Sequence, residues 1–347
     1  MTSEILELQE SAREVLAAEG LAAKDEKVWS LALDLGWLLI ALPEQHGGLG
    51  QGLAGACAFH QEFGRGLAPA STPSAMLALD AVASSETIEV ASWVERLTTQ
   101  DYLAAPLADG SLKLANGRFS GTLRAVPSAD RAAFVLATAS DGDCVALIAL
   151  NQSGVTRIAR PTWDETRRLF DIELREVALD AALILARGAA AQKLARRIAT
   201  QRDFALAADA VGGAEALLAM TVDYLKTRKQ FSRPLALFQA LKHRCADLKA
   251  QTVAAQALLA DSLARVGESL DDEQAQTLAQ RAKYLACTVY ARVAEESLQL
   301  HGGIGMTSEH NCHLFLKRAL LNQQLGSGTA REEQDIAERF LSQLASA

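Results

Sequence analysis

The chain has 347 residues, of which 50% are hydrophobic and 22% charged, and its formal net charge is −8 at pH 7. This length and hydrophobicity allow a large buried core and exclude a disordered or fibrous chain. The acidic balance gives no overall positive field, so neither nucleic acid nor a membrane is expected as a partner. The five cysteines form no C-x-x-C pair, which is typical of reduced core residues in a cytoplasmic protein.

The first zone of the chain, from Ser3 to about Leu97, has hydrophobic residues at spacings of three and four, which predicts amphipathic helices. The stretch Met1–Glu10 lacks the apolar region of a signal peptide, so no targeting segment is expected. Gly50–Gly55 fits the dinucleotide-binding pattern G-x-G-x-x-G. However, no suitable acidic residue follows it and no βαβ alternation continues, so a loop between two helices is the better interpretation.

The second zone, residues 98–190, has short hydrophobic runs that predict strands of an antiparallel β-sandwich or small barrel. The clearest runs are Phe134–Ala137 and Val145–Leu150, with Val155–Ile158 and Glu173–Leu179 as further candidates. Turn residues bound the runs, at Asp109-Gly110, Asn116-Gly117, Asp141-Gly142 and Asn151–Gly154.

The third zone, residues 191–347, returns to the helical period in three long segments, at about Ala190–Lys229, Phe238–Val266 and Asp272–His301. With the shorter segments that follow, they predict a four-helix bundle. The fold class is therefore α+β and multidomain: an N-terminal helical domain (1–97), a middle β domain (98–190) and a C-terminal bundle (191–347). The alanine-rich bundle helices suit close packing between subunits, so we expect at least a dimer.

Three clusters of polar residues or glycines could have a chemical role. His310, Cys312 and His313 lie close together, but no second cluster completes a ligand set, so no metal site is expected. Arg228, Gln230 and Gln239 could face a phosphorylated ligand, although basic residues also occur at helix ends to offset the macrodipole. Gln299–Gly305 contains three glycines, which is more than a helix C-cap requires. Together the last two motifs favour a cofactor site.

These motifs, at their spacing, resemble the acyl-CoA dehydrogenase family, and the resemblance extends over essentially the whole chain. They are Tyr224–Leu235 followed by Phe238–Asp247, and Glu296–Gly305. The loop at Trp37–Gly50 is also similar to that of the family. The continuation Ser308–Ala319 resembles the branch that acts on steroid and steroid side-chain thioesters.

The resemblance implies FAD as the cofactor and an acyl-CoA as the substrate. In the family, a glutamate removes the α proton of the acyl-CoA while hydride passes from the β carbon to the flavin. Family residues that match the two motifs of this chain hold the adenosine-diphosphate half of an FAD whose flavin ring lies in a neighbouring subunit. The cofactor-binding residues that the resemblance implies here are Arg228, Gln230, Phe231, Gln239, Gln299, Leu300, Gly302, Gly303 and Thr329.

The chain departs from the family at the position of the catalytic base. Ser327 stands where the usual glutamate would be, and a serine hydroxyl is too weakly basic to replace it. Arg202 stands at the other position from which relatives supply a glutamate. Asp209, two helical turns further on, is only a weak candidate. The flavin-contacting loops of the family are not recognisable around Leu103–Lys113 and Gly121–Ala129.

The sequence therefore predicts an acyl-CoA dehydrogenase-like flavoprotein subunit for α,β-dehydrogenation of an acyl-CoA thioester, in one interpretation steroid-derived. We expect a subunit that lacks its own base and completes the FAD site of a homologous partner. Alternatives are a homo-oligomeric flavoenzyme, dimeric or tetrameric, with an unrecognised base or different flavin chemistry, and a non-enzymatic relative that binds CoA esters.

Overall fold

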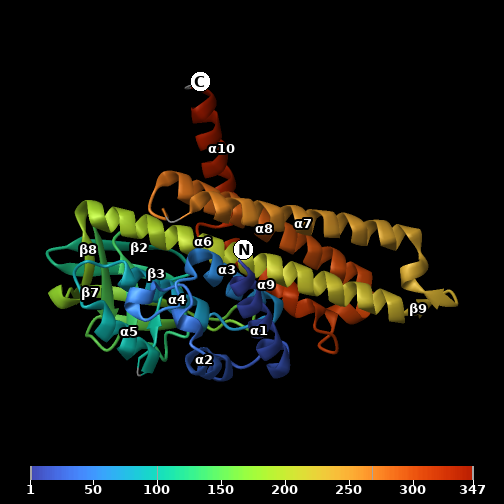
Figure 1. The fold of residues 1–347 in the computed structure, drawn as a ribbon, viewed down its shortest axis with the longest axis horizontal. Coiled ribbons are helices and arrows are strands. Elements are labelled where there is room, and N and C mark those ends of the chain that lie inside the picture. The colour runs from blue at the N-terminus through green and yellow to red at the C-terminus, as the bar shows by residue number, and fades with distance from the viewer. Residues whose placement is uncertain (1, 100, 268, 346–347) are drawn as a thin grey trace.

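The computed structural model describes residues 2–99, 101–267 and 269–345; residues 1 and 346–347, the outer ends of the first and last predicted zones, lie outside this range. Helices form the first part of the chain, strands the middle and long helices the rest (Figure 1). This order confirms the predicted fold class. The N-terminal elements are α1 (Ser3–Glu19), α2 (Asp25–Asp34), the 3-10 turns η1 (Trp37–Leu39) and η2 (Glu44–His46), α3 (Gly52–Arg65), α4 (Ser71–Ala83) and α5 (Val90–Thr99).

Local sequence explains where these helices begin and which face they bury. The hydroxyl of Thr2 caps α1 by accepting a hydrogen bond from the backbone N–H of Ile5 at 3.3 Å. Around Gly50–Gly55 a loop follows η2, and α3 begins at Gly52. A dinucleotide-binding turn needs a strand before it, but η1 occupies that place. The predicted loop between helices is thus confirmed.

The middle region consists of two four-stranded sheets, ordered β1-β4-β5-β8 and β2-β3-β7-β6. All neighbouring strands in them are antiparallel except β1 and β4. The strands are β1 (Leu103–Ala104), β2 (Ala108–Ala115), β3 (Arg118–Pro127), β4 (Phe134–Thr138), β5 (Cys144–Ala149), β6 (Val155–Arg160), β7 (Leu169–Ala178) and, after the 3-10 turn η3 (Ala181–Leu183), β8 (Ile184–Arg187).

Three of the four turns predicted in this region are right, including Asp141-Gly142 and Asn151–Gly154, and one is wrong. Asn116 and Gly117 both have positive φ, 49° and 70°, and join β2 to β3 as a tight hairpin. Asp109-Gly110 is not a turn, because it lies inside β2, where the pairing register shifts between Ala108 and Ser111. The glycine serves close packing there: a Cβ at Gly110 would lie 2.5 Å from the carbonyl oxygen of Thr122.

The C-terminal part is built on α6 (Gly188–Thr227), which runs from the β region to the far end of the molecule (Figure 1). α6 is long and apolar enough to cross a membrane, but 67% of that stretch is buried inside the protein, as in a core helix. The remaining elements are β9 (Lys229–Gln230), β10 (Arg233–Pro234), η4 (Leu235–Leu237), α7 (Gln239–Val266), α8 (Glu273–His301), η5 (Gly302–Met306), α9 (Cys312–Gln324) and α10 (Thr329–Ala345).

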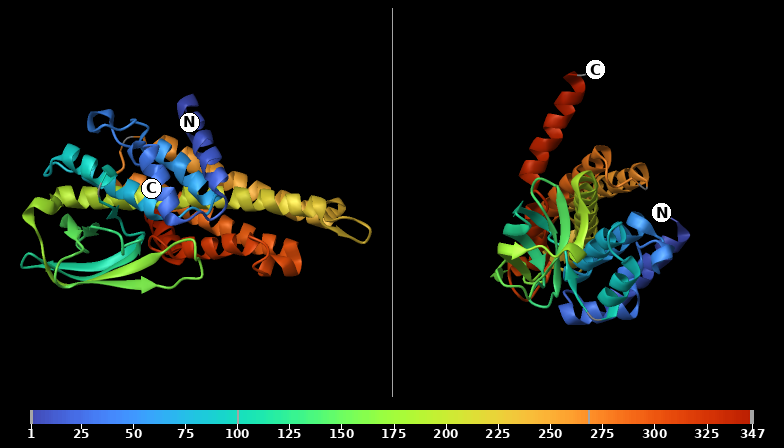
Figure 2. Two further views of the ribbon diagram at one scale, coloured as in Figure 1. Left: turned by 90° about the horizontal axis from the view of Figure 1, so that it is seen from below. Right: turned by 90° about the vertical axis from the view of Figure 1, so that its left-hand side faces the viewer.

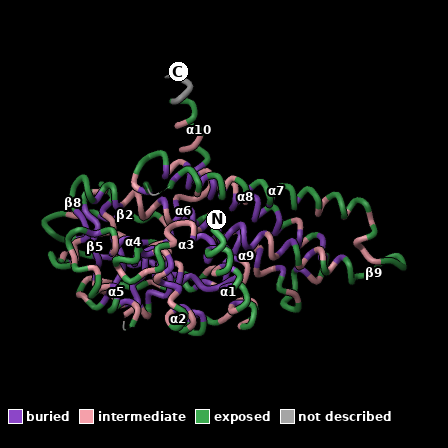
Figure 3. The backbone as a smooth tube through the Cα atoms, viewed as in Figure 1, coloured by how far each residue is buried: buried purple, intermediate pink, exposed green. Residues whose placement is uncertain are grey.

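Two large hydrophobic cores, with a much smaller third cluster beside them, are found in the described residues. One joins side chains of the N-terminal helices with those of both sheets, and the other fills the bundle. The first core crosses residue 97, so the division into domains at 97 and 190 stays a prediction. α10 projects away from the rest (Figure 2), and Phe340 and Leu341 on it are 53% and 63% exposed. The outer surface of α7 is also largely exposed, whereas α6 is buried along much of its length (Figure 3).

Candidate functional site

The two sequence motifs meet at one end of the bundle. The Tyr224 ring, near the end of α6, stacks on the His301 ring at the end of α8, with 4.5 Å between centroids. The Tyr224 hydroxyl also donates a hydrogen bond to the backbone oxygen of His301 at 3.3 Å. Arg228, one turn beyond Tyr224, therefore lies at the same end of the bundle as the Gly302–Met306 turn. We call residues 224–239 and 299–306 the motif end.

The side chains that the resemblance assigns to the cofactor are exposed at the motif end. They are Arg228, Gln230, Phe231 and Gln239. The β9–β10 hairpin is closed by a 2.8 Å hydrogen bond from the Leu235 N–H to the Arg228 carbonyl, and Phe231, at its turn, has a φ of 52° and is 85% exposed. Arg228 has no ion pair among the described residues, so its guanidinium and the exposed Phe231 ring are both free to contact a ligand.

The second motif leaves room for a ligand against its backbone. Cβ atoms placed on Gly302 or Gly303 would meet nothing within 4 Å, so the turn between α8 and α9 is open to solvent. Gln299 is exposed, whereas the Leu300 side chain is 5% exposed in the bundle core, so Leu300 can contact a ligand only through its backbone. Open backbone, amide side chains and Arg228 suit the adenosine-diphosphate half of FAD.

The histidines near this end make contacts among themselves. The rings of His301 and His310 lie 4.3 Å apart, and the Nδ1 of His310 accepts a hydrogen bond from the Cys312 N–H at 3.2 Å. Burial lowers the pKa of His301, and the neighbouring His310 lowers it further. Among the described residues, no three His, Cys, Asp or Glu side chains lie close enough together to hold a metal ion.

A second group of functional interest lies near the middle of α6, in a cavity of about 410 Å³ between the β region, α6 and α10. Arg202 lines this cavity, and its Nη1 donates a hydrogen bond to Asp109 of β2 at 2.8 Å. Its Nε donates to Asp203 at 3.3 Å. The side chain of Arg202 is only 9% exposed, and these two carboxylates hold its pKa above the usual value against the effect of burial. We call this cavity the charged cleft.

Ser327 and Thr329 lie beside the charged cleft, in the loop after α9 and at the start of α10, and not at the motif end. Gly326, next to Ser327, accepts a hydrogen bond from the Asp109 N–H at 3.0 Å and donates one to Leu107 at 2.7 Å. These bonds fasten the loop after α9 to the start of β2. Thr329 is the first residue of α10, immediately after this loop. The structure therefore does not bring Thr329 together with the other predicted cofactor residues.

Behind this loop lies a buried ion pair that the sequence reasoning missed. Lys283 of α8 pairs with Glu332 of α10, and both side chains are fully buried. Burial raises the pKa of Glu332 to about 7, Lys283 opposes the shift and Asp203 adds to it. A signal was present, because Lys283 lies on the same helical stripe as the core residues Ala279 and Cys287. A lysine at a core-facing position predicts a buried partner.

Asp209, the weak candidate for a base, is held in a different buried network. Its Oδ2 accepts hydrogen bonds from Arg167 at 2.6 Å and Arg318 at 3.4 Å, and its Oδ1 accepts one from Asn322 at 2.7 Å. Arg318 also binds Asp164, so the network ties α6 to α9 and to the loop before β7. Because buried donors bind both carboxylate oxygens of Asp209, this arrangement favours a structural role.

On the other side of α6, little space is left between α6 and the N-terminal helices. Arg197 and Asp80 form a two-point ion pair between α6 and α4, with both contacts at 2.7 Å. The cavity beside this pair, lined by His60 and Gln201 among others, holds about 20 Å³, which is room for a single water molecule. A hydrocarbon chain could not be accommodated between α4 and α6.

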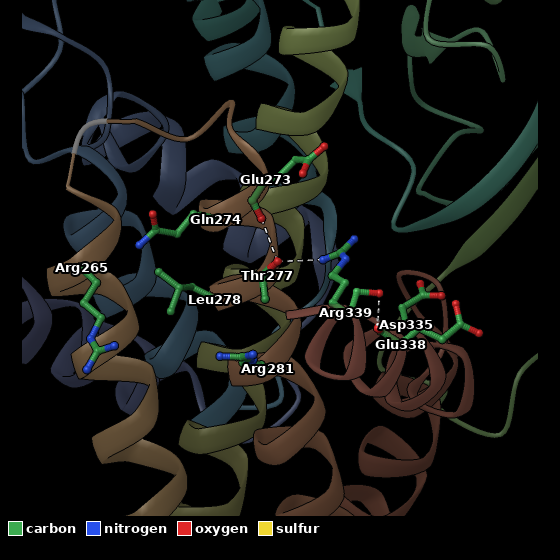
Figure 4. A pocket seen from close by; sticks show the side chains of 10 residues that line it. Arg265, Glu273, Gln274, Thr277, Leu278, Arg281, Asp335, Glu338 and Arg339 are labelled. Atoms are coloured by element: carbon green, nitrogen blue, oxygen red, sulfur yellow. Dashed lines mark hydrogen bonds between the residues drawn. The ribbon is translucent and has the colours of Figure 1, made fainter. Parts of the chain in front are cut away.

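A larger cavity, of about 820 Å³, lies between the end of α7, the start of α8 and α10 (Figure 4). Its lining mixes both charges and includes Arg265, Arg281 and Glu338. Arg339 from α10 donates a 2.9 Å hydrogen bond to Thr277 across it. None of the predicted site residues lines this cavity.

Comparison with known proteins agrees with the arrangement of helices, sheets and bundle. Residues 2–91 match the family model of the acyl-CoA dehydrogenase N-terminal domain, and residues 193–341 match that of the C-terminal domain. Acyl-CoA dehydrogenase IpdE2 of Mycobacterium tuberculosis is 33% identical over 317 residues, which cover 87% of this chain and 82% of the relative. The chain belongs to the acyl-CoA dehydrogenase family.

Two solved structures are similar over nearly the whole length. A variant of the Tcur3481–Tcur3483 steroid ACAD superposes with a TM-score of 0.85 and 27% identity, covering 99% of both chains. A chain of the ChsE4–ChsE5 complex from Mycobacterium tuberculosis gives a TM-score of 0.85 and 25% identity, covering 98% of both chains. The chain thus has the fold and motifs of an acyl-CoA dehydrogenase-like subunit, and its steroid-linked relatives agree with the resemblance at Ser308–Ala319.

Proposed function

We propose that this chain is a base-lacking, cytoplasmic subunit of a heteromeric acyl-CoA dehydrogenase and completes the FAD site of a homologous partner subunit. The carrying observation is the charged cleft: the residue at the second base position, Arg202, is a cation bound between Asp109 and Asp203. A base must accept the α proton of a thioester, which a guanidinium cannot do at neutral pH. Ser327 offers no carboxylate either.

The two halves of FAD fit this chain unequally. The motif end has exposed Arg228 and Gln239 and an open glycine turn, which suit an adenosine diphosphate. The charged cleft suits the flavin ring poorly, because the Arg202–Asp109 ion pair spans it between α6 and β2. When bound, FAD supplies the hydride acceptor. This chain's part is to hold the pyrophosphate and adenosine of a flavin whose ring lies in the partner.

The substrate of the complex is proposed to be a steroid-derived acyl-CoA. The support is the similarity to relatives named as a steroid ACAD and as the ChsE4–ChsE5 complex, together with the Ser308–Ala319 segment. The narrow space between α4 and α6 supports placing the acyl group in the partner.

The decisive experiment is a visible absorbance spectrum of the purified chain, alone and after co-expression with a homologous acyl-CoA dehydrogenase subunit. We expect the chain alone to be colourless and the complex to show the flavin band and to bleach with a steroid-derived acyl-CoA. A yellow chain that is bleached by acyl-CoA without any partner would disprove the proposal and favour a homo-oligomeric flavoenzyme.

A further inference from the structure

The charged cleft has two chemically different walls. One wall is apolar and brings together side chains from both sheets and α6, among them Leu112, Leu123, Leu136 and Ile198. The other wall bears the guanidinium groups of Arg202 and Arg331, with the carboxylate of Asp109 between α6 and β2. A cavity of about 410 Å³ with an apolar wall and a few convergent polar groups has the properties of a small-molecule site.

The three charged side chains differ in how firmly they are held. The Arg202 side chain is 9% exposed and keeps Asp203, which is 1% exposed, as a second partner. The Asp109 side chain is 57% exposed and is bound by Arg202, while its backbone N–H donates a hydrogen bond to Gly326. Because the Asp109 side chain is more than half exposed, its carboxylate can exchange Arg202 for water, and the guanidinium still keeps Asp203 as a partner. Arg202 would remain in place.

Arg331 adds a second positive group to the wall that bears Arg202. It lies exposed in the first turn of α10, and no ion pair is found for it in the described part of the chain. The amino-terminal end of α10 adds a partial positive charge at the same place. Although burial opposes it, the charges of Arg202, Arg331 and Lys283 hold the pKa of Asp109 below its usual value. An anion is therefore favoured between Arg202 and Arg331.

We propose that the charged cleft binds an apolar carboxylic acid, whose carboxylate replaces that of Asp109 between Arg202 and Arg331. The hydrocarbon part of the ligand lies against the wall formed by Leu112, Leu123 and Leu136. A free acid fits better than a CoA thioester, since a thioester carbonyl has no charge to pair with two guanidinium groups. This inference rests on the proposed function, because the cleft must be free of a flavin ring.

The test compares the binding of 2-naphthoate with that of 2-naphthamide, which has the same ring system without the charge. Titration calorimetry uses the full chain, alone and in complex with its homologous partner. We expect the acid to bind at least about tenfold more tightly than the amide. Asp109→Asn removes the internal competitor and is expected to tighten naphthoate binding about tenfold, while Arg331→Gln weakens it by a similar factor.

The variants are chosen so that folding is preserved. Asp109 and Arg331 are exposed, and Arg202 keeps Asp203 as a partner in both cases. Arg281→Gln, in the separate cavity between α7, α8 and α10, is the matched control and should leave naphthoate binding unchanged. The inference is overturned if acid and amide bind equally, or if neither Asp109→Asn nor Arg331→Gln changes the affinity.

The visible spectrum separates a failure of this inference from a failure of the proposed function. A colourless chain that does not distinguish the acid from the amide overturns the carboxylate site alone. A chain that purifies with its own flavin and excludes naphthoate from the cleft overturns both proposals.

Discussion

At the scale of single residues, one substitution changes the chemistry of the charged cleft. A glutamate at position 202 would lie beside Asp109 and Asp203, and three carboxylates in a partly buried space would repel each other. Arginine instead neutralises both acids and joins α6 to β2. The same side chain therefore takes the place of the base and joins α6 to β2, so the loss of the base and the new contact follow from one residue.

Arg228 is the residue most directly testable at the motif end. Replacing it with alanine removes a charge-assisted pair with the pyrophosphate, worth roughly 1.5–3 kcal/mol. We expect the affinity of the heteromeric complex for FAD to fall about 10- to 150-fold, measured by flavin release on dilution. Arg265→Ala, an exposed arginine paired with Asp261 on α7, is the control and should have no effect. Unchanged flavin retention in Arg228→Ala would exclude the assigned role.

Glu332 makes the stability of the folded protein decrease as the pH rises. Burial raises its pKa to about 7 in the folded state from the usual 4.5, so the folded protein binds this proton more tightly than the unfolded chain. The resulting stability is fully present below about pH 4.5 and is lost as the pH rises through about 7.

This pH dependence can be isolated with a single variant. We expect the free energy of unfolding of the wild type to fall between about pH 5 and pH 8 relative to Glu332→Gln, by at most about 3 kcal/mol. Denaturant titrations at each pH measure the difference. Parallel curves for the two proteins would show that Glu332 does not titrate in this range.

At the scale of elements, the contact between α3 and α6 depends on small residues. Cβ atoms at Gly64 and Gly212 would lie 1.9 Å and 1.8 Å from backbone oxygens of the facing helix, at Asp209 and Gln61. Backbone atoms cannot move aside as a flexible side chain can. This close approach fixes the N-terminal helices against the bundle, and with them the position of Arg202 opposite the β region.

Gly212→Ala tests this packing. The added methyl group forces the helices apart, and we expect the free energy of unfolding to fall by roughly 2–4 kcal/mol even though alanine is the better helix former. Gly303→Ala, where a Cβ meets nothing within 4 Å, is the matched control, and we expect its effect to be within about 0.5 kcal/mol. Equal stability of the two variants would mean that α3 and α6 can separate without cost.

Sequence periodicity predicted the long helices well. The segments expected at Phe238–Val266 and Asp272–His301 correspond to α7 and α8 within one residue at each end. Local signals were strong there, because Pro234 and Gly302 interrupt long apolar stripes. β2 was missed because Asp109-Gly110 has the composition of a turn but occupies an irregular strand, where close packing against Thr122 requires the glycine.

At the scale of the whole molecule, the two candidate sites differ in how far they could be predicted. The motif end is encoded in two local motifs, so the sequence identified its residues directly. In the charged cleft the sequence singled out Arg202 and Ser327. Their partners come from β2, α8 and α10, and only the tertiary fold brings these elements together. Long-range ion pairs of this kind leave only weak signals in a single sequence, such as a lysine on a core-facing stripe.

The last prediction concerns the activity of the whole assembly. We expect the isolated chain to have no acyl-CoA dehydrogenase activity, since removal of the α proton requires a carboxylate with a pKa near the working pH. Ser327→Glu should not restore activity, because Arg202 would pair with the new carboxylate and keep its pKa low, and the space between α4 and α6 remains about 20 Å³. The activities of the wild type and of Ser327→Glu are both measured as flavin bleaching with a steroid-derived acyl-CoA.

In complex with a homologous subunit, turnover should be the same for wild type and Ser327→Glu, because the partner supplies the base. If Ser327→Glu alone bleaches flavin, the cleft of this chain is intact and lacks only its base. If the wild-type chain does so by itself, a base exists among its own residues and the need for a partner disappears.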